Sequence, residues 1–182
     1  VTLSSASTGV LSNQVLHGAP VDLLFAADRE SPDKLFHAGI GQQPFCYAIG
    51  QLVLVGQHGD LDKLAQPGLS LAIANPATAP YGRAAMEVLQ REAFIDARER
   101  KLVRGNNAVQ AYQFWHSGAV ALALVPRSLA PEATTIPQAW HQPLRQHAMV
   151  LKESAAASAL LQWLQRAEVR EQITGAGYLP CP

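Results

Sequence analysis

Residues 45–55 read FCYAIGQLVLV, a long apolar run with Gly50 inside it. Such a run is typical of a strand buried on both faces, and the internal glycine makes it a candidate crossing segment between two parts of a protein. A second apolar strand is expected at residues 147–151. The two strands bracket a self-contained middle, which predicts a second lobe at 49–146 and a discontinuous first lobe made of 1–48 and 147–182.

Short apolar runs alternate with helical patterns on both sides of this segment. Strands are expected at 1–4, 21–27, 69–74, 101–104 and 120–125. Helices are expected at 10–17, 80–94 and 107–117, with one or two more at 154–173. A further helix is expected to open at Ser31-Pro32, with Ser31 as its N-cap and Pro32 at the first helical position. Alternation of this kind predicts the α/β class, with parallel or mixed sheets flanked by helices.

The composition is that of an ordinary globular protein, with 48% hydrophobic and 15% charged residues. Its 14 basic and 14 acidic residues cancel. This balance argues against nucleic acid as a partner, because a surface that follows phosphates needs an excess of Lys and Arg. No apolar run reaches the ~18–20 residues that cross a bilayer, so no direct membrane insertion is expected. The residues after Val1 show no signal-peptide pattern.

The two cysteines, Cys46 and Cys181, have a spacing that matches no metal motif. Two unrelated thiols are the simpler interpretation. The alternative is a bridge that fixes the C-terminal tail, which would need Cα atoms within about 7 Å and an oxidising compartment. The histidines show no i, i+4 pair, so no metal site is expected at His17, His37, His58, His116, His141 or His147.

Three loops share one property, since each runs from an expected strand into a helix start and carries small or hydroxyl residues. They are Ser7-Thr8-Gly9, Ala79-Pro80-Tyr81-Gly82 and Asn106-Asn107-Ala108. A helix start has about four backbone N–H groups without partners in the helix and a partial positive charge. It therefore attracts anions without any Lys or Arg. Three converging starts would form a cage of neutral donors for a tetrahedral oxyanion, although each loop alone is also explained as a plain N-cap.

Residues 7–28, STGVLSNQVLHGAPVDLLFAAD, resemble a pattern of the periplasmic molybdate-binding components of ABC importers. In that family a Ser-Ser-Gly loop precedes a helix that ends in Gly-Ala-Pro, followed by Asp, a strand and Ser-Ala-Asp. Three further segments match in the family's order. They are its crossing strand at 47–54, its second-lobe loop with Pro-Tyr-Gly at 72–82, and its closing Gly-Tyr at 175–178. The similarity covers essentially all 182 residues, and the Gly-Ala-Pro and Pro-Tyr-Gly motifs in register make it specific.

The resemblance implies a two-lobed periplasmic solute-binding fold of type II that closes around its ligand at a hinge. Molybdate or tungstate would be held by hydrogen bonds alone, with no cofactor and no bound metal cation. Sulfate would be disfavoured by a rigid cage that fits the larger anion. The implied ligand residues are Ser7 and Thr8 through their hydroxyls, and Tyr81 and Ala108 through their backbone N–H groups. The implied partner is the membrane permease of an ABC transporter, and a monomer in the periplasm is expected.

Three departures from the family pattern bear on this expectation. The family begins with a further strand, a ligand loop and a helix, whereas this sequence starts at what resembles the second strand, so the resemblance implies that the first βα unit, about 30 residues, is absent from it. Pro126 stands where some members have a ligand Tyr, and apolar Ala121 replaces a usual Asp near the hinge. We therefore expect weakened oxyanion binding in this N-terminally truncated form. We also expect the unpaired edge of an incomplete first lobe to be a route to association with another chain.

Two competing functions remain open from the residues. One is a degenerate relative that binds no oxyanion, or a different, sulfate-like one. The other is a small hydrolase with Ser5, Ser7 or Thr8 as nucleophile. The hydrolase lacks support because the chain has no Gly-x-Ser-x-Gly elbow and no His recognisably placed against an Asp.

Overall fold

The computed structural model describes residues 2–56 and 60–182, and it describes only the backbone of Arg98. The chain forms two compact units, unit 1 from Val1–Gly50 with Leu144–Pro182 and unit 2 from Gln51–Pro143. These limits differ by two or three residues from those that the sequence suggested. Whether the units act as the lobes of a binding protein remains a prediction. The interpretation of His58 lies outside the described residues.

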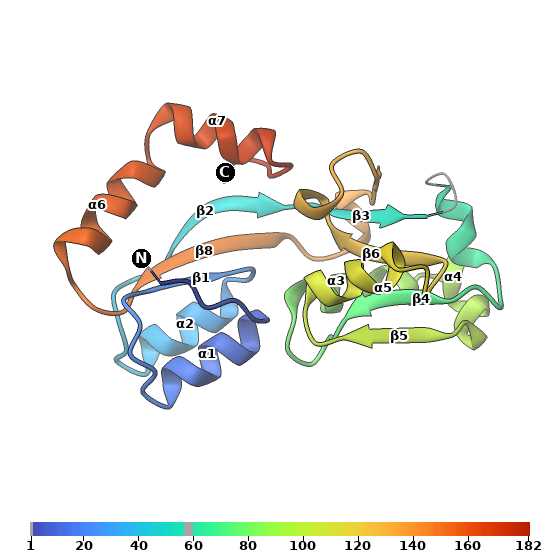
Figure 1. The fold of residues 1–182 in the computed structure, drawn as a ribbon, viewed down its shortest axis with the longest axis horizontal. Helices are drawn as coiled ribbons and strands as arrows, with labels where there is room; N and C mark the ends of the chain where they lie inside the picture. The colour runs from blue at the N-terminus through green and yellow to red at the C-terminus, as the bar shows by residue number, and fades with distance from the viewer. Residues whose placement is uncertain (1, 57–59) are drawn as a thin grey trace. The chain divides into compact units, whose positions relative to one another are not determined.

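Unit 1 is built on a three-stranded sheet, sheet A, in the order β1-β8-β2 (Figure 1). Its strands are β1 (Leu23–Ala26), β8 (Leu144–Val150) and β2 (Phe45–Gly50). β8 is antiparallel to both neighbours. The register along β2 shifts between Cys46 and Ala48, so Tyr47 is an extra, bulged residue. The central strand of sheet A is thus β8, which comes from the C-terminal part of the chain.

Helices α1 (Thr8–Leu16) and α2 (Glu30–His37) lie on one face of sheet A, and α6 (Ala155–Leu164) and α7 (Ala167–Gly175) on the other side (Figure 1). The first pair is held by an apolar cluster. Its buried members are Val15, Leu24, Leu35 and Met149. Burial of such side chains contributes about 1.5–3 kcal/mol each, so this cluster fixes α1 and α2 against β1 and β8.

The C-terminal tail lies along the outer edge of β2. Leu179 forms an antiparallel bridge with Ile49, and each backbone N–H donates to the other's carbonyl over 2.8 Å. This pairing brings the Cα atoms of Cys46 and Cys181 to 6.2 Å, and the two sulfurs form a disulfide. The interpretation as two unrelated thiols is therefore wrong, and the bridge that fixes the tail is present.

Unit 2 contains a five-stranded mixed sheet, sheet B, in the order β5-β4-β6-β3-β7. The strands are β3 (Leu52–Val55), β4 (Leu71–Ala74), β5 (Leu102–Gly105), β6 (Leu122–Pro126) and β7 (Thr134–Thr135). β4 is parallel to β5 and to β6, whereas β3 is antiparallel to β6 and to β7. All four residues of β3 and of β4 are buried, which explains why both read as unbroken apolar runs.

The helices of unit 2 follow its parallel strands. They are α3 (Pro80–Leu89), α4 (Glu92–Ile95) and α5 (Ala108–His116), with 3-10 turns at η2 (Leu61–Ala65), η3 (Asp96–Glu99), η4 (Arg127–Leu129) and η5 (Gln138–Trp140). α3 follows β4 and α5 follows β5, so both helices begin near the carboxyl edge of sheet B. Within the described residues, no helix has the length and apolar character needed to cross a membrane.

The structure corrects four sequence predictions in unit 1 and unit 2. The run 45–55 forms two strands in two sheets rather than one strand, because the chain leaves sheet A at Gly50. No strand is present at residues 2–4, where the backbone is exposed coil. The helix expected at 80–94 ends at Leu89, and α4 starts anew at Glu92. α2 begins at Glu30, so Ser31 lies inside its first turn and is not its N-cap.

Candidate functional site

The first loop brings Ser7 and Thr8 to the start of α1. Ser7 occupies the N-cap position with extended backbone angles, and Thr8 is the first helical residue. Both side chains are buried, each with 6% of its surface exposed. The Oγ1 atom of Thr8 accepts a hydrogen bond from the backbone N–H of Ala27 over 3.0 Å, which fixes α1 against the end of β1. Because that oxygen accepts, the hydroxyl hydrogen of Thr8 can be donated elsewhere.

The hydroxyl of Ser7 is buried without a hydrogen-bond partner among the described residues. A serine at the N-cap ordinarily accepts a hydrogen bond from an N–H of the first turn, yet this one makes no such bond. A buried hydroxyl left unsatisfied costs about 1–3 kcal/mol. A polar group held in this way is expected to meet a partner that is not part of the protein.

The second and third loops lie together at one edge of sheet B. Ala74, the last residue of β4, pairs in parallel with Gly105, the last residue of β5. The N–H of Asn75 donates to the carbonyl of Gly105 over 2.7 Å. Tyr81 and Ala108 stand in the first turns of the helices that follow these two strands, α3 and α5. Unit 2 thus places both predicted backbone donors at the carboxyl edge of adjacent parallel strands.

Two glycines let these helix starts approach the sheet closely. A Cβ on Gly82 would lie 2.8 Å from the carbonyl carbon of Ala74 and closer still to its oxygen. A Cβ on Gly105 would lie 2.7 Å from the backbone nitrogen of Ala111. Both contacts are closer than real Cβ atoms allow, so only glycine permits α3 and α5 to begin where they do.

The start of α5 is held by its own side chains. The Asn107 side chain accepts from the N–H of Gln110 over 2.9 Å, and the Gln110 side-chain oxygen accepts from the N–H of Asn106 over 2.6 Å. Ala108 is the first residue of α5, a position whose N–H has no carbonyl of the helix itself within reach. The cap therefore orders the loop around Ala108.

None of α1, α3 and α5 carries an acidic residue in its first turn in the described structure. Carboxylates are favoured there because they offset the positive end of the helix dipole. α2 shows the usual arrangement, with Glu30 and Asp33 in its first turn. The three helix starts identified from sequence therefore have no acidic residue to offset their positive ends, a property that they share with α6.

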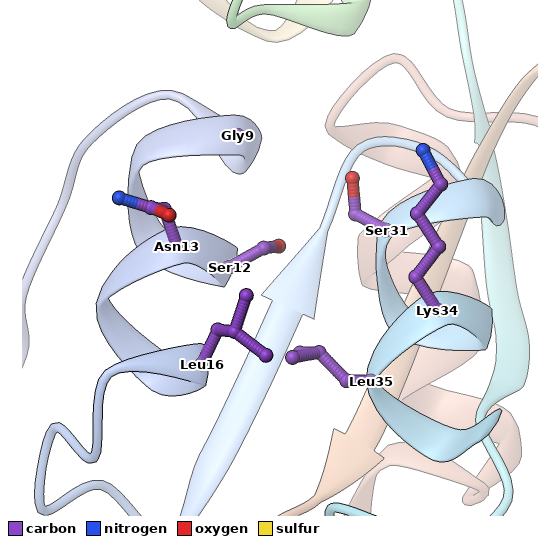
Figure 2. A pocket seen from close by; sticks show the side chains of 7 residues that line it. All are labelled: Gly9, Ser12, Asn13, Leu16, Ser31, Lys34 and Leu35. Atoms are coloured by element: carbon purple, nitrogen blue, oxygen red, sulfur yellow. The ribbon is translucent and has the colours of Figure 1, made fainter. Parts of the chain in front are cut away.

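A surface hollow of about 330 Å³ lies beside α1, between it and α2 (Figure 2). Figure 2 shows Leu16 and Leu35 facing each other across it, with the Ser12 hydroxyl directed into the gap. Lys34 stands at its rim, paired with Glu30 over 2.6 Å. The hollow includes neither Ser7 nor Thr8. It is therefore a separate feature from the candidate donors.

Sequence reasoning missed two groups that organise the first loop. One is the backbone N–H of Ala27, whose role depends on tertiary folding and has no local signal. The other is Asp28, whose carboxylate accepts from both the N–H and the hydroxyl of Ser31. Asp28 stands three residues before Ser31, which is the spacing of a capping side chain to the first turn, so the pattern could have identified it. Within the described residues, no group of three or more His, Cys, Asp or Glu gathers to hold a metal ion.

Comparison with known proteins places this arrangement in a family. A family model described as bacterial extracellular solute-binding protein matches residues 1–179. The chain belongs to this family. The molybdate-binding protein ModA of Azotobacter vinelandii is 35% identical over 98% of this solute-binding protein and 78% of its own length. The ModA protein of Rhodobacter capsulatus is 34% identical over 98% of this chain and 77% of its own.

A solved structure agrees with this placement. The periplasmic molybdate-binding protein of Azotobacter vinelandii superposes with a TM-score of 0.90 at 32% identity, covering 100% of this chain and 88% of that one. The match confirms the α/β fold of the periplasmic-binding-protein type. Solute-binding proteins are not enzymes and carry no cofactor, so membership does not favour the hydrolase with Ser5, Ser7 or Thr8 as nucleophile.

Proposed function

We propose that this solute-binding protein takes up molybdate or tungstate as the binding component of an ABC importer. The proposed donors are the hydroxyls of Ser7 and Thr8 from unit 1 and the backbone N–H groups of Tyr81 and Ala108 from unit 2. The two units act as lobes that close around the anion. The proposal is supported by two relatives above 30% identity that are named molybdate-binding proteins.

The observation that carries the proposal is the hydroxyl of Ser7. It is buried, unsatisfied and placed at the N-cap of a helix whose first turn carries no acidic residue. An oxyanion oxygen is the partner that this environment favours, because it accepts from the hydroxyl and is attracted by the helix start. Hydrogen bonds to a charged partner contribute about 1.5–3 kcal/mol each.

Neutral donors select by geometry rather than by charge. A doubly charged tetrahedral anion can be held by several oriented N–H and O–H groups when water is excluded, because their dipoles then act in a low dielectric. A rigid set of donors spaced for the larger molybdate or tungstate leaves some hydrogen bonds of sulfate unmade. We therefore expect sulfate to bind more weakly than either.

The proposed partner in the membrane is the permease of the transporter, and the proposed location is the periplasm. The Cys46–Cys181 disulfide supports that location, because such bridges persist in oxidising compartments. We propose a monomer. Association with a second chain through the edge of β1 is the alternative, since β1 pairs on one side only within sheet A.

Isothermal titration of residues 1–182 with molybdate, tungstate and sulfate tests the function. Ser7→Ala removes the proposed donor, and Ser12→Ala is the matched control. Ser12 also has a buried, unsatisfied hydroxyl on α1, but it lines the hollow between α1 and α2. We expect Ser7→Ala to weaken molybdate binding by about 10- to 100-fold. We expect Ser12→Ala to leave it unchanged.

Two results would overturn the proposal. One is the absence of binding to any of the three anions by the parent chain. The other is an equal loss of affinity in Ser7→Ala and Ser12→Ala, which would make the effect one of helix stability rather than of ligand contact. The affinity of the parent chain also tests the expectation of weakened binding.

A further inference from the structure

The C-terminal segment of unit 1 is thinly packed. In the described stretch 151–182, the buried residues are Ala157 of α6 and Val169 of α7. Trp163, the largest apolar side chain of α6, keeps 43% of its surface exposed. Helices of nine or ten residues are marginal on their own, and most of their stability comes from packing an apolar face. The docking of α6 and α7 therefore depends strongly on what holds the ends of the segment.

One end continues directly from β8, and the other is the tail beyond α7. The tail is attached through its two backbone hydrogen bonds with Ile49 and through the Cys46–Cys181 disulfide. Tyr47, the bulged residue of β2, lies in the sequence between Cys46 and Ile49, the two residues that the tail binds, and its side chain is largely buried. Burial raises the pKa of its hydroxyl well above the usual value, and nearby Tyr178 of the tail adds to the increase. The tail thus covers the outer edge of β2, an edge that would otherwise expose unpaired backbone groups.

We infer that the Cys46–Cys181 disulfide is a redox latch that keeps α6, α7 and the tail docked on unit 1. The latch closes when the two thiols lose two electrons and two protons to a disulfide-bearing oxidant, which is reduced to a dithiol. Thiol–disulfide exchange with a dithiol reductant reverses the step. Both cysteines are half-buried rather than enclosed, so an exchange partner can approach them.

Opening the latch removes the covalent attachment, while the two backbone hydrogen bonds between Leu179 and Ile49 can remain. Backbone hydrogen bonds add little net stability because water competes for the same groups, so they hold a thinly packed segment less firmly than the bridge does. The segment then opens locally while sheet A stays formed. Ile49 lies next to Gly50, the last residue of unit 1 before the chain enters unit 2. The latch therefore also holds the end of β2, the strand through which the chain leaves unit 1. The inference concerns unit 1 alone and holds whichever anion the protein binds.

Hydrogen–deuterium exchange of the full chain tests the latch. We compare the oxidised protein, the same protein with a phosphine reductant, and the double variant Cys46→Ser, Cys181→Ser. In the reduced protein and in the variant, exchange across residues 155–179 and at the Ile49 amide is expected to rise about tenfold or more, as for local opening. Exchange in β4 is expected to stay the same. The reductant should change nothing further in the variant, which controls for effects of the reagent.

Equal exchange in the oxidised and reduced proteins would overturn the inference, because the segment would then be docked without the bridge. So would equal protection of residues 155–179 and of sheet A in the reduced protein, since the segment would then open only when the whole of unit 1 unfolds. Free thiols at both cysteines in protein isolated under oxidising conditions would also refute it. None of these outcomes depends on molybdate binding.

Discussion

Replacement of both Cys46 and Cys181 by serine should lower the stability of unit 1 by an amount that the chain topology sets. The bridge joins residues 135 apart and so closes a loop that contains all of unit 2. Loop-closure entropy for that length corresponds to about 5 kcal/mol when the whole chain unfolds together. If unit 2 stays folded, the flexible part of the loop is residues 46–50 and 144–181, about 43 residues, and the loss falls to about 4 kcal/mol.

Urea denaturation can separate these cases because each unit has its own tryptophans. Trp163 belongs to α6 of unit 1, whereas Trp115 and Trp140 belong to unit 2. Fluorescence of variants that retain a tryptophan in one unit would follow each transition, with and without the bridge. We expect the unit 1 transition to lose about 4 kcal/mol and the unit 2 transition to stay unchanged. A loss below about 1 kcal/mol in unit 1 would refute the loop-entropy reasoning.

Three further predictions concern single positions. Gly82→Ala should destabilise unit 2 by about 1–3 kcal/mol in urea, because the new methyl overlaps the carbonyl of Ala74; unchanged stability would contradict this. Asn107→Ala removes the cap on the N–H of Gln110 and should cost about 1 kcal/mol, with weaker molybdate binding in titration. Burial lowers the pKa of His147, so the unfolded chain binds the proton more readily. The free energy of unfolding should therefore be highest above a pH of about 6.5 and fall below it, by at most about 1.4 kcal/mol per pH unit. His147→Gln should reduce that decline between pH 7.5 and 5.5, and an identical decline would exclude His147 as its cause.

Much of the fold could be predicted from the sequence, because several strands are buried on both faces. The apolar runs around 71–74 and 122–126 mark β4 and β6 to within a few residues. The run 45–55 shows where this reasoning stops. Two consecutive strands that belong to different sheets can both be apolar. In the sequence, the break between β2 and β3 at Gly50 therefore looks the same as a glycine inside a single strand.

The candidate site divides in the same way. The starts of α3 and α5 could be recognised because each follows a strand and carries residue types that begin helices. The choice of Ser7, Tyr81 and Ala108 as ligand residues rests on the family resemblance and stays a prediction. Their surroundings could not be predicted, since the Ala27–Thr8 hydrogen bond joins residues 19 apart. The disulfide joins residues 135 apart, and two cysteines at such a distance give no local pattern that distinguishes a bridge from two thiols. Contacts made by tertiary folding remain invisible to periodicity and capping rules.

The central position of β8 in sheet A has a consequence for the order in which the protein matures during synthesis. Unit 2 is contiguous in the chain, so a nascent polypeptide contains all of it before β8 has been translated. β1 and β2 each pair with β8, so both must wait for it, with apolar Leu24 and Ala48 lacking their native cover. The inserted unit can therefore fold first on the ribosome, and the amino-terminal segment becomes native only when the carboxyl-terminal segment arrives.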